Sequence, residues 1–242
     1  SAYGFRSLGV LVDATFPVLA IILIFLATLA FRLLVTDSDR RMLRSAFGHF
    51  VSPDVLAEIE RNAGELKLGG EVREISVLFV DIRKSTTLSE KLPPDALVSL
   101  INTLLDRWSA SIIAQSGTID KFIGDAIMAF WNAPLSKPDH QYYAARAALG
   151  IRKATAEVNA DSEVSRIPKE RGQWPLQCGV GMSSGPACVG NMGSETRFDY
   201  SAVGETVNVA ARTETASKRA DFDIVIAGAL DSLARKLERQ LG

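Results

Sequence analysis

The longest uninterrupted hydrophobic stretch of the chain lies near its N-terminus. Residues 14–31 (ATFPVLAIILIFLATLAF) form a run of 18 residues without a charged side chain. A run of this length predicts a transmembrane helix over about 14–35, with the long stem of Arg32 reaching toward the lipid head groups. The alternative is a buried core helix, which usually shows polar residues along one face, and this run has few of them.

Charged residues flank this stretch unevenly. Arg40, Arg41 and Arg44 follow it closely, whereas only Arg6 precedes it. Because positively charged residues favour the cytoplasmic side, we expect a plasma-membrane or inner-membrane protein whose chain after residue 36 is cytoplasmic. The stretch lacks the basic start and the small-residue cleavage site of a signal peptide, and no Met opens the chain, so we expect a longer protein.

A polar segment separates the hydrophobic run from the next periodic pattern. Within it, Ser52 can cap a helix, Pro53 suits the first helical position, and Asp54 favours the positive helix end. The sequence therefore predicts a transmembrane region in residues 1–36 and a helical linker at 37–70. This linker either transmits a signal or acts as a passive spacer.

The remaining residues, 71–242, alternate between strand-like and helix-like patterns. The run at 93–117 has apolar residues at helical spacing, and two short β-rich runs flank Gly124–Asp125 in the manner of a hairpin. Helices alternating with paired strands predict an α/β (α+β) domain in which helices flank a mixed sheet. The other expected elements are strands at 74–82 and 221–228, helices at about 138–159 and 205–220, and a hairpin formed by 176–185 and 186–193.

Composition and charge exclude several classes of function. With 27 Lys+Arg and 28 Asp+Glu the net charge is −1, which argues against a nucleic-acid partner. Two histidines and two cysteines are too few for a zinc site built on these residue types, so a bound metal should sit on carboxylates. Cys178 and Cys188 flank the expected turn of a hairpin and could pair geometrically, but in a reducing cytoplasm we expect free thiols.

Two aspartates stand where strands end. Asp81 closes VLFVD, and Asp125 occupies the tip of the expected hairpin KFIGDAIMAF. If these strands are neighbours, the carboxylates converge at one edge of the sheet, an arrangement that suits Mg²⁺ or Mn²⁺ and in-line phosphoryl displacement. From spacing alone, a structural explanation is equally good, since aspartate also favours turns and helix caps.

Three stretches together favour the metal-site interpretation of these aspartates over the structural one. VLFVDIRKSTTLSE, GTIDKFIGDAIMAFW and RFDYSAVGETVNVAAR, in this order, resemble the signatures of the class III nucleotidyl cyclase catalytic domain, the adenylate/guanylate cyclase family. The resemblance covers roughly residues 74–228 and implies a ferredoxin-like mixed sheet. The hydrophobic run followed by FGHFVSPDVLAEI also resembles bacterial membrane-bound adenylate cyclases with an extracellular CHASE2-type sensor, which this chain does not contain.

The resemblance implies a set of metal-binding residues. Asp81 and Asp125 match the family's metal-binding aspartates, and the backbone carbonyl of Ile82 matches a further ligand. The cofactors implied are two Mg²⁺ (or Mn²⁺) ions per active site. The turn that follows departs from the family, because Lys84 and Ser85 stand where many relatives carry Gly–Phe or a similar pair.

The resemblance also implies the residues that bind and convert the nucleotide. Lys121 matches the position where adenylate cyclases place a lysine against adenine, and Ser201 matches its partner in base recognition. A serine hydroxyl can donate or accept, so Ser201 alone discriminates poorly between bases. Asn208 and Arg212 match the transition-state pair, and their i, i+4 spacing places both on one helix face.

These positions together imply a membrane-anchored adenylate cyclase. It would convert ATP to 3′,5′-cyclic AMP and pyrophosphate in sites shared by the two subunits of a homodimer. The alternatives are a guanylate cyclase, which Lys121 disfavours, and a catalytically weak nucleotide-binding or dimerisation module. The family domain usually continues into further strands, so we expect these to be missing after Gly242.

Overall fold

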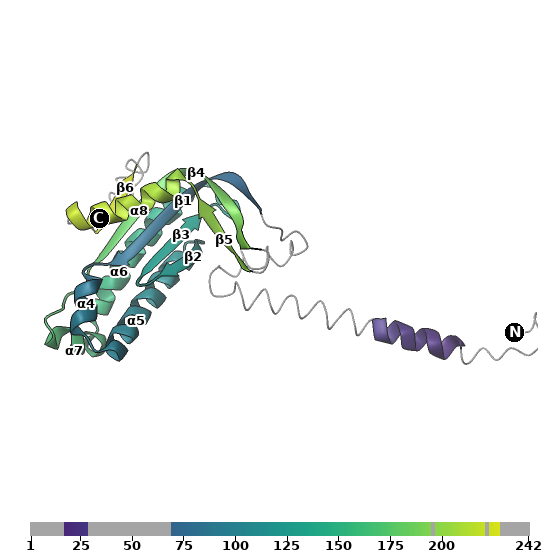
Figure 1. The fold of residues 1–242 in the computed structure, drawn as a ribbon, viewed down its shortest axis with the longest axis horizontal. Coiled ribbons are helices and arrows are strands. Elements are labelled where there is room, and N and C mark those ends of the chain that lie inside the picture. The colour runs from purple at the N-terminus through teal and green to yellow at the C-terminus, as the bar shows by residue number, and fades with distance from the viewer. Residues whose placement is uncertain (1–16, 29–68, 195–196, 221–222, 228–242) are drawn as a thin grey trace, which may run out of the picture. The chain divides into compact units, whose positions relative to one another are not determined.

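The chain divides into two compact units, residues 1–47 and 48–242. The computed structural model describes residues 17–28, 69–194, 197–220 and 223–227 (Figure 1). In the first unit these residues form a helix over 17–28 with exposed apolar side chains. No helix within the described ranges is both long and apolar enough to cross a membrane. The rest of the predicted span at 14–35, and the predicted linker up to residue 68, lie outside the described residues.

The second unit is built on a mixed six-stranded sheet in the order β2-β3-β1-β4-β5, with β6 beside β4. All neighbouring strands are antiparallel except β4 and β6, which are parallel. This confirms the predicted mixed sheet flanked by helices. The strands are β1 (Gly69–Ile82), β2 (Thr118–Ile123), β3 (Ala126–Trp131), β4 (Cys178–Ser194), β5 (Arg197–Val203) and β6 (Ile224–Ala227). The helices are α4 (Ser85–Lys91), α5 (Pro94–Ile113), α6 (His140–Ala160), α7 (Ser162–Glu170) and α8 (Glu205–Ala220).

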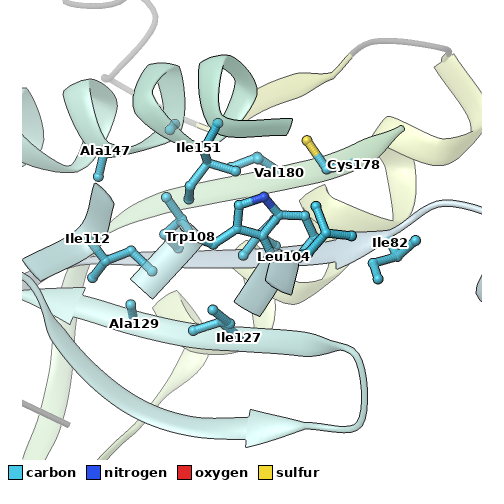
Figure 2. Packing of buried hydrophobic residues seen from close by; sticks show 14 of the residues in the cluster. Ile82, Leu104, Trp108, Ile112, Ile127, Ala129, Ala147, Ile151, Cys178 and Val180 are labelled. Atoms are coloured by element: carbon cyan, nitrogen blue, oxygen red, sulfur yellow. The ribbon is translucent and has the colours of Figure 1, made fainter. Parts of the chain in front are cut away.

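The sheet has a hydrophobic cluster on each face. Helices α5 and α6 cover one face, where Trp108 and Ile151 pack against alternate residues of the central strands, among them Val180 of β4 (Figure 2). Helix α8 covers the other face, where Ala210 packs with Val77 of β1. Because successive side chains of a strand point to opposite faces, the continuous apolar run of β1 supplies both clusters. The sheet is therefore buried on both sides, and its edges and strand ends carry the polar chemistry.

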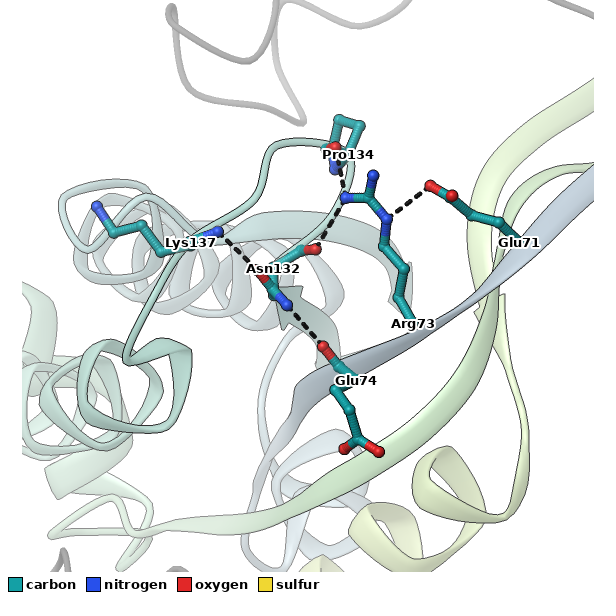
Figure 3. A network of polar contacts seen from close by, with 6 residues as sticks. All are labelled: Glu71, Arg73, Glu74, Asn132, Pro134 and Lys137. Atoms are coloured by element: carbon teal, nitrogen blue, oxygen red, sulfur yellow. Dashed lines mark hydrogen bonds and ion pairs between the residues drawn. The ribbon is translucent and has the colours of Figure 1, made fainter.

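A polar network fixes the loop after β3 against β1 (Figure 3). Arg73 donates from Nη1 to the carbonyl oxygens of Asn132 and Pro134, at 3.2 and 2.9 Å. Asn132 in turn donates from Nδ2 to the carbonyl of Glu74 at 2.8 Å, and its Oδ1 accepts from the Lys137 amide. These side chains satisfy backbone groups that the sheet leaves unpaired at this strand end.

The predicted hairpin over 176–193 is wrong. These residues belong largely to one 17-residue strand, β4, which pairs with β1 without interruption from Ile82↔Cys178 to Gly69↔Asn191. The small residues at 183–186 resemble a turn locally, but a long partner strand holds them extended. Cys178 and Cys188 consequently lie ten positions apart on one extended strand, roughly 33 Å by strand rise, and both are free thiols as expected.

Helix α8 packs very closely on β4 because β4 carries glycines beneath it. A Cβ atom on Gly181 would lie 2.0 Å from the backbone nitrogen of Glu214, and one on Gly179 would lie 2.6 Å from Ser217 Oγ. Gly179 also pairs with Asp81 across the sheet. The last turns of α8 therefore lie beside the end of β1, where the first predicted site residue stands.

Candidate active site

Asp81 and Asp125 lie together at one edge of the sheet. Asp81 is the penultimate residue of β1, Asp125 is at the β2–β3 tip, and the β1–β3 register pairs Val80 with Ile127. Burial raises the pKa of Asp125, and the neighbouring Asp81 carboxylate raises it further, whereas a hydrogen bond from Ser85 lowers it. The predicted convergence of the two carboxylates is therefore present in the structure.

This pair fits a hard divalent cation. Asp81 Oδ1 and Asp125 Oδ2 are both buried without a hydrogen-bond partner among the described residues. Unpaired carboxylate oxygens of this kind are costly unless a cation approaches them. No cluster of three or more His, Cys, Asp or Glu side chains occurs in the described ranges, so the side-chain ligands here would be the two carboxylates. Ile82, the predicted backbone ligand, follows Asp81 at the end of β1.

A lysine from α8 reaches the Asp81 carboxylate of this pair. Lys218 Nζ lies 2.5 Å from Asp81 Oδ2 and 3.3 Å from Oε1 of the buried Glu214. The Asp81 hydrogen bond and the charges of both carboxylates raise the pKa of Lys218 against the lowering effect of its burial. Lys218 thus places one positive charge beside the Asp81–Asp125 pair.

The turn between β1 and α4 contains the departure noted in the sequence. Lys84 adopts φ 58° and ψ 32°, in the left-handed region that favours glycine, and precedes the first residue of α4. Ser85 follows, and its hydroxyl is the group that hydrogen-bonds Asp125. Ser85 therefore supports the carboxylate site, while Lys84 forms the left-handed turn that precedes α4.

A second cluster joins β2 to β5. Ser201 Oγ donates to Asp120 Oδ2 at 2.7 Å, and Lys121 Nζ lies 3.4 Å from Asp120 Oδ1. The Asp120 side chain is fully buried, whereas 48% of the Lys121 side chain is exposed. The structure thus brings Lys121 and Ser201, which are 80 positions apart in the sequence, to one buried carboxylate.

Asn208 and Arg212 stand on the exposed face of α8. The Arg212 side chain is 70% exposed, and its Nη2 lies 2.5 Å from Glu205 Oε1, one of the first residues of the same helix. The opposite face of α8, which includes Ala210 and Glu214, packs on the sheet. Arg212 therefore pairs within its own helix, not with the Asp81–Asp125 pair.

Sequence reasoning missed three of these charged residues. Asp120 sits in a strand beside a lysine, where an exposed ion pair is the ordinary expectation. Glu214 and Lys218 have the i, i+4 spacing of a helix-surface pair, and only the close approach of α8 to β4 turns them toward Asp81. The one available signal was the glycine at alternate positions 179 and 181, which indicates a close backbone approach.

Comparisons with known proteins agree with this geometry. Residues 70–235 match the family model described as the adenylate and guanylate cyclase catalytic domain. Adenylate cyclase 1 of Rhizobium meliloti (strain 1021) is 34% identical over 158 residues, which make up 65% of this chain and 23% of that protein. This chain spans between 23% and 34% of the length of the curated relatives it matches.

Solved structures of both kinds of cyclase resemble this one. The adenylyl cyclase CyaB from P. aeruginosa has a TM-score of 0.63 and 32% identity, covering 70% of this chain and 84% of that one. The guanylyl cyclase Cya2 has a TM-score of 0.56 and 36% identity, covering 62% of this chain and 73% of that one. The family match extends over more than half of the residues and includes both carboxylates of the Asp81–Asp125 pair. The chain belongs to the adenylate and guanylate cyclase catalytic domain family.

Proposed function

We propose that this chain is the catalytic part of an adenylate cyclase, which converts ATP to 3′,5′-cyclic AMP and pyrophosphate. The observation that carries the proposal is the meeting of Asp81 and Asp125, each with a buried and unpaired oxygen, inside a cyclase-family domain. Such a pair has the ligand chemistry for cations that accompany a triphosphate.

The reaction forms one bond and breaks one at the α-phosphorus. The ribose 3′-oxygen attacks, its proton leaves to solvent, and the bond to the bridging oxygen of the departing pyrophosphate breaks. Asp81, Asp125 and the Ile82 carbonyl would hold two Mg²⁺ or Mn²⁺ ions. When bound, these ions would lower the pKa of the ribose 3′-hydroxyl and neutralise the charge of the triphosphate. Arg212 stabilises the charge that grows on the phosphorus oxygens, and Asn208 orients the ribose.

Lys121 and Ser201 are proposed to bind the base. Lys121 can only donate hydrogen bonds, which matches the N1 acceptor of adenine and conflicts with the N1–H of guanine. The half-exposed Lys121 side chain and the Ser201 hydroxyl both contact Asp120, which supports this assignment. On this basis ATP, rather than GTP, is the proposed substrate.

The site is proposed to be completed by a second copy of the chain. Asn208 and Arg212 are exposed, and Arg212 pairs with Glu205 instead of approaching Asp81. A two-fold dimer would bring the exposed face of α8 from one subunit to the Asp81–Asp125 pair of the other, and symmetry then makes two equal sites.

Membrane anchoring belongs to the same proposal. The support is the uncharged run at 14–31 and the arginines that follow it, which would place the cyclase domain on the cytoplasmic side of the plasma or inner membrane. Separation of membranes from the soluble fraction of cells expressing the chain tests this part, and recovery of all the chain in the soluble fraction would refute it.

The activity is tested with the purified chain, ATP or GTP, and Mg²⁺ or Mn²⁺, by measuring the cyclic nucleotide and pyrophosphate. We expect cyclic AMP and pyrophosphate in equal amounts, and less product from GTP. Asp125→Asn keeps the shape of the side chain but removes its charge, and we expect it to lower the activity at least about 100-fold. Equal activity of the wild type and Asp125→Asn would refute the proposal.

A further inference from the structure

The Ser201 hydroxyl has a fixed direction in this structure. A serine hydroxyl carries one hydrogen to donate and two lone pairs to accept with. Ser201 Oγ donates its hydrogen to Asp120 Oδ2 at 2.7 Å. Toward any other neighbour, Ser201 is therefore an acceptor only.

Asp120 is well placed to impose this direction. Its side chain is fully buried, with Lys121 Nζ 3.4 Å from Oδ1 and a backbone hydrogen bond from Ala202. Burial raises the pKa of Asp120, while the contacts with Ser201, Lys121 and Ala202 favour its charged form. A carboxylate in that form accepts hydrogen bonds and cannot donate one, so Ser201 has to be the donor.

The two purines differ at the atom that an acceptor would meet. Adenine carries an amino group at position 6, which donates, whereas guanine carries an oxygen there, which accepts. An acceptor-only hydroxyl pairs with the adenine amino group and faces the guanine oxygen with no hydrogen between them. Sites built to hydrogen-bond a substrate group discriminate strongly against an analogue that leaves them unpaired.

We propose that Asp120 is a positioning residue for base selection, which holds Ser201 as an acceptor and thereby makes the site prefer adenine to guanine. This inference rests on the proposed adenylate cyclase function and on the base-binding role of Ser201 and Lys121. A serine hydroxyl can in general donate or accept a hydrogen bond, and the contact with Asp120 makes Ser201 an acceptor toward the base. Selection then depends on a buried residue that does not itself touch the base.

Asp120→Asn is the decisive variant because it has the same shape as the wild type. In the orientation that keeps the amide oxygen toward Lys121, at the position of Oδ1, the amide nitrogen occupies the place of Oδ2. That nitrogen donates to Ser201 Oγ, which frees the hydroxyl hydrogen to point toward the base. We expect the ratio of kcat/KM for ATP to that for GTP to fall about tenfold or more.

A binding measurement separates base selection from catalysis. The nucleotides 3′-deoxy-ATP and 3′-deoxy-GTP lack the attacking hydroxyl and cannot cyclise, so their dissociation constants report recognition alone. The preference for the adenine analogue should fall in Asp120→Asn by a factor similar to the fall in the kcat/KM ratio. A purely structural role of Asp120 would weaken both analogues equally.

The Ser201→Ala background identifies the route of the effect. Once Ser201→Ala has removed the hydroxyl, adding Asp120→Asn should cause no further change in the base preference. A further change of similar size in this background would show that Asp120 acts through the charge of Lys121, and would overturn the inference. If Asp120→Asn does not fold, Ser201→Thr should keep the wild-type preference and Ser201→Ala should lose it, and equal preferences in the two would overturn the inference.

Failure of this inference is distinguishable from failure of the proposed function. A wild-type chain that prefers GTP, or that cyclises neither nucleotide, refutes the proposed function. A wild-type chain that prefers ATP, with the same preference in Asp120→Asn, refutes only the role of Asp120.

Discussion

Replacing Gly181 with alanine should push helix α8 away from the sheet. The added Cβ would lie 2.0 Å from the backbone nitrogen of Glu214 and 2.5 Å from the carbonyl oxygen of Ala210. An ordinary contact begins at about 3.4 Å, so α8 has to move by roughly 1.4 Å at this point. The atoms it meets belong to the backbone, which has no alternative rotamer, so overpacking should cost about 3 kcal/mol.

This displacement should affect activity as well as stability. Thermal unfolding should show a Tm lower by roughly 6–12 °C, from about 2–4 °C per kcal/mol for a domain of this size. Since α8 carries Asn208 and Arg212, a movement of this size should also lower kcat about 100-fold, measured at a temperature where the variant is folded.

A second glycine provides the control. Gly150→Ala introduces a Cβ in α6 whose nearest neighbour is Ser111 Cβ at 3.2 Å, so a small adjustment suffices. Its unfolding free energy should stay within about 1 kcal/mol of the wild type, because alanine also favours the helix. The reasoning would be refuted if Gly181→Ala matched Gly150→Ala in both Tm and kcat.

Three further predictions concern the dimer, the carboxylates and pH. An Asp81→Ala chain mixed with an Arg212→Ala chain should recover about a quarter of wild-type activity, since about half of the dimers are mixed and each has one intact site; no recovery contradicts shared sites. Lys218→Met removes the positive charge that would compete with a metal ion for Asp81, and should tighten Mn²⁺ binding by the nucleotide-free chain about tenfold in calorimetry. An unchanged affinity would contradict competition between Lys218 and the metal ion. Burial lowers the pKa of His140, so the folded state loses stability as pH falls below about 6.5, where the unfolded chain binds the proton. His140→Asn, which can keep the 2.8 Å contact to Ser76, should lose less Tm between about pH 7.5 and 5.5, and an equal loss would place the effect elsewhere.

Strong local patterns made most of the fold predictable. The helix expected at 93–117 is α5 at Pro94–Ile113, and the hairpin around Gly124–Asp125 is β2 and β3, because periodicity and turn residues act over a few neighbouring positions. The length of β4 was not predictable in this way. It depends on pairing with β1, about 110 residues away, which overrides the turn-like Ser–Ser–Gly–Pro segment.

The site shows the same division between local and distant information. The convergence of Asp81 and Asp125 was predictable if β1 and β3 are neighbours, as they are, because Asp81 lies at the end of β1 and Asp125 lies in the turn directly before β3. The contact of Lys218 with Asp81 spans 137 positions and that of Ser201 with Asp120 spans 81. In each case the sequence alone suggests an ordinary surface residue. Its partner lies on a distant element, and only the packing of the two elements brings the residues together.

Helix α8 carries two residues that, in the proposed dimer, would belong to two different active sites. Lys218, near the end of the helix, contacts Asp81 of its own subunit, while the exposed Arg212 lies about two turns away on the same helix. In the proposed dimer this one helix therefore borders both sites, its own through Lys218 and the partner's through Arg212. In that dimer, a movement of α8 that separates Lys218 from Asp81 in one site would also displace the arginine that serves the other, so the helix would be a physical link between the two sites.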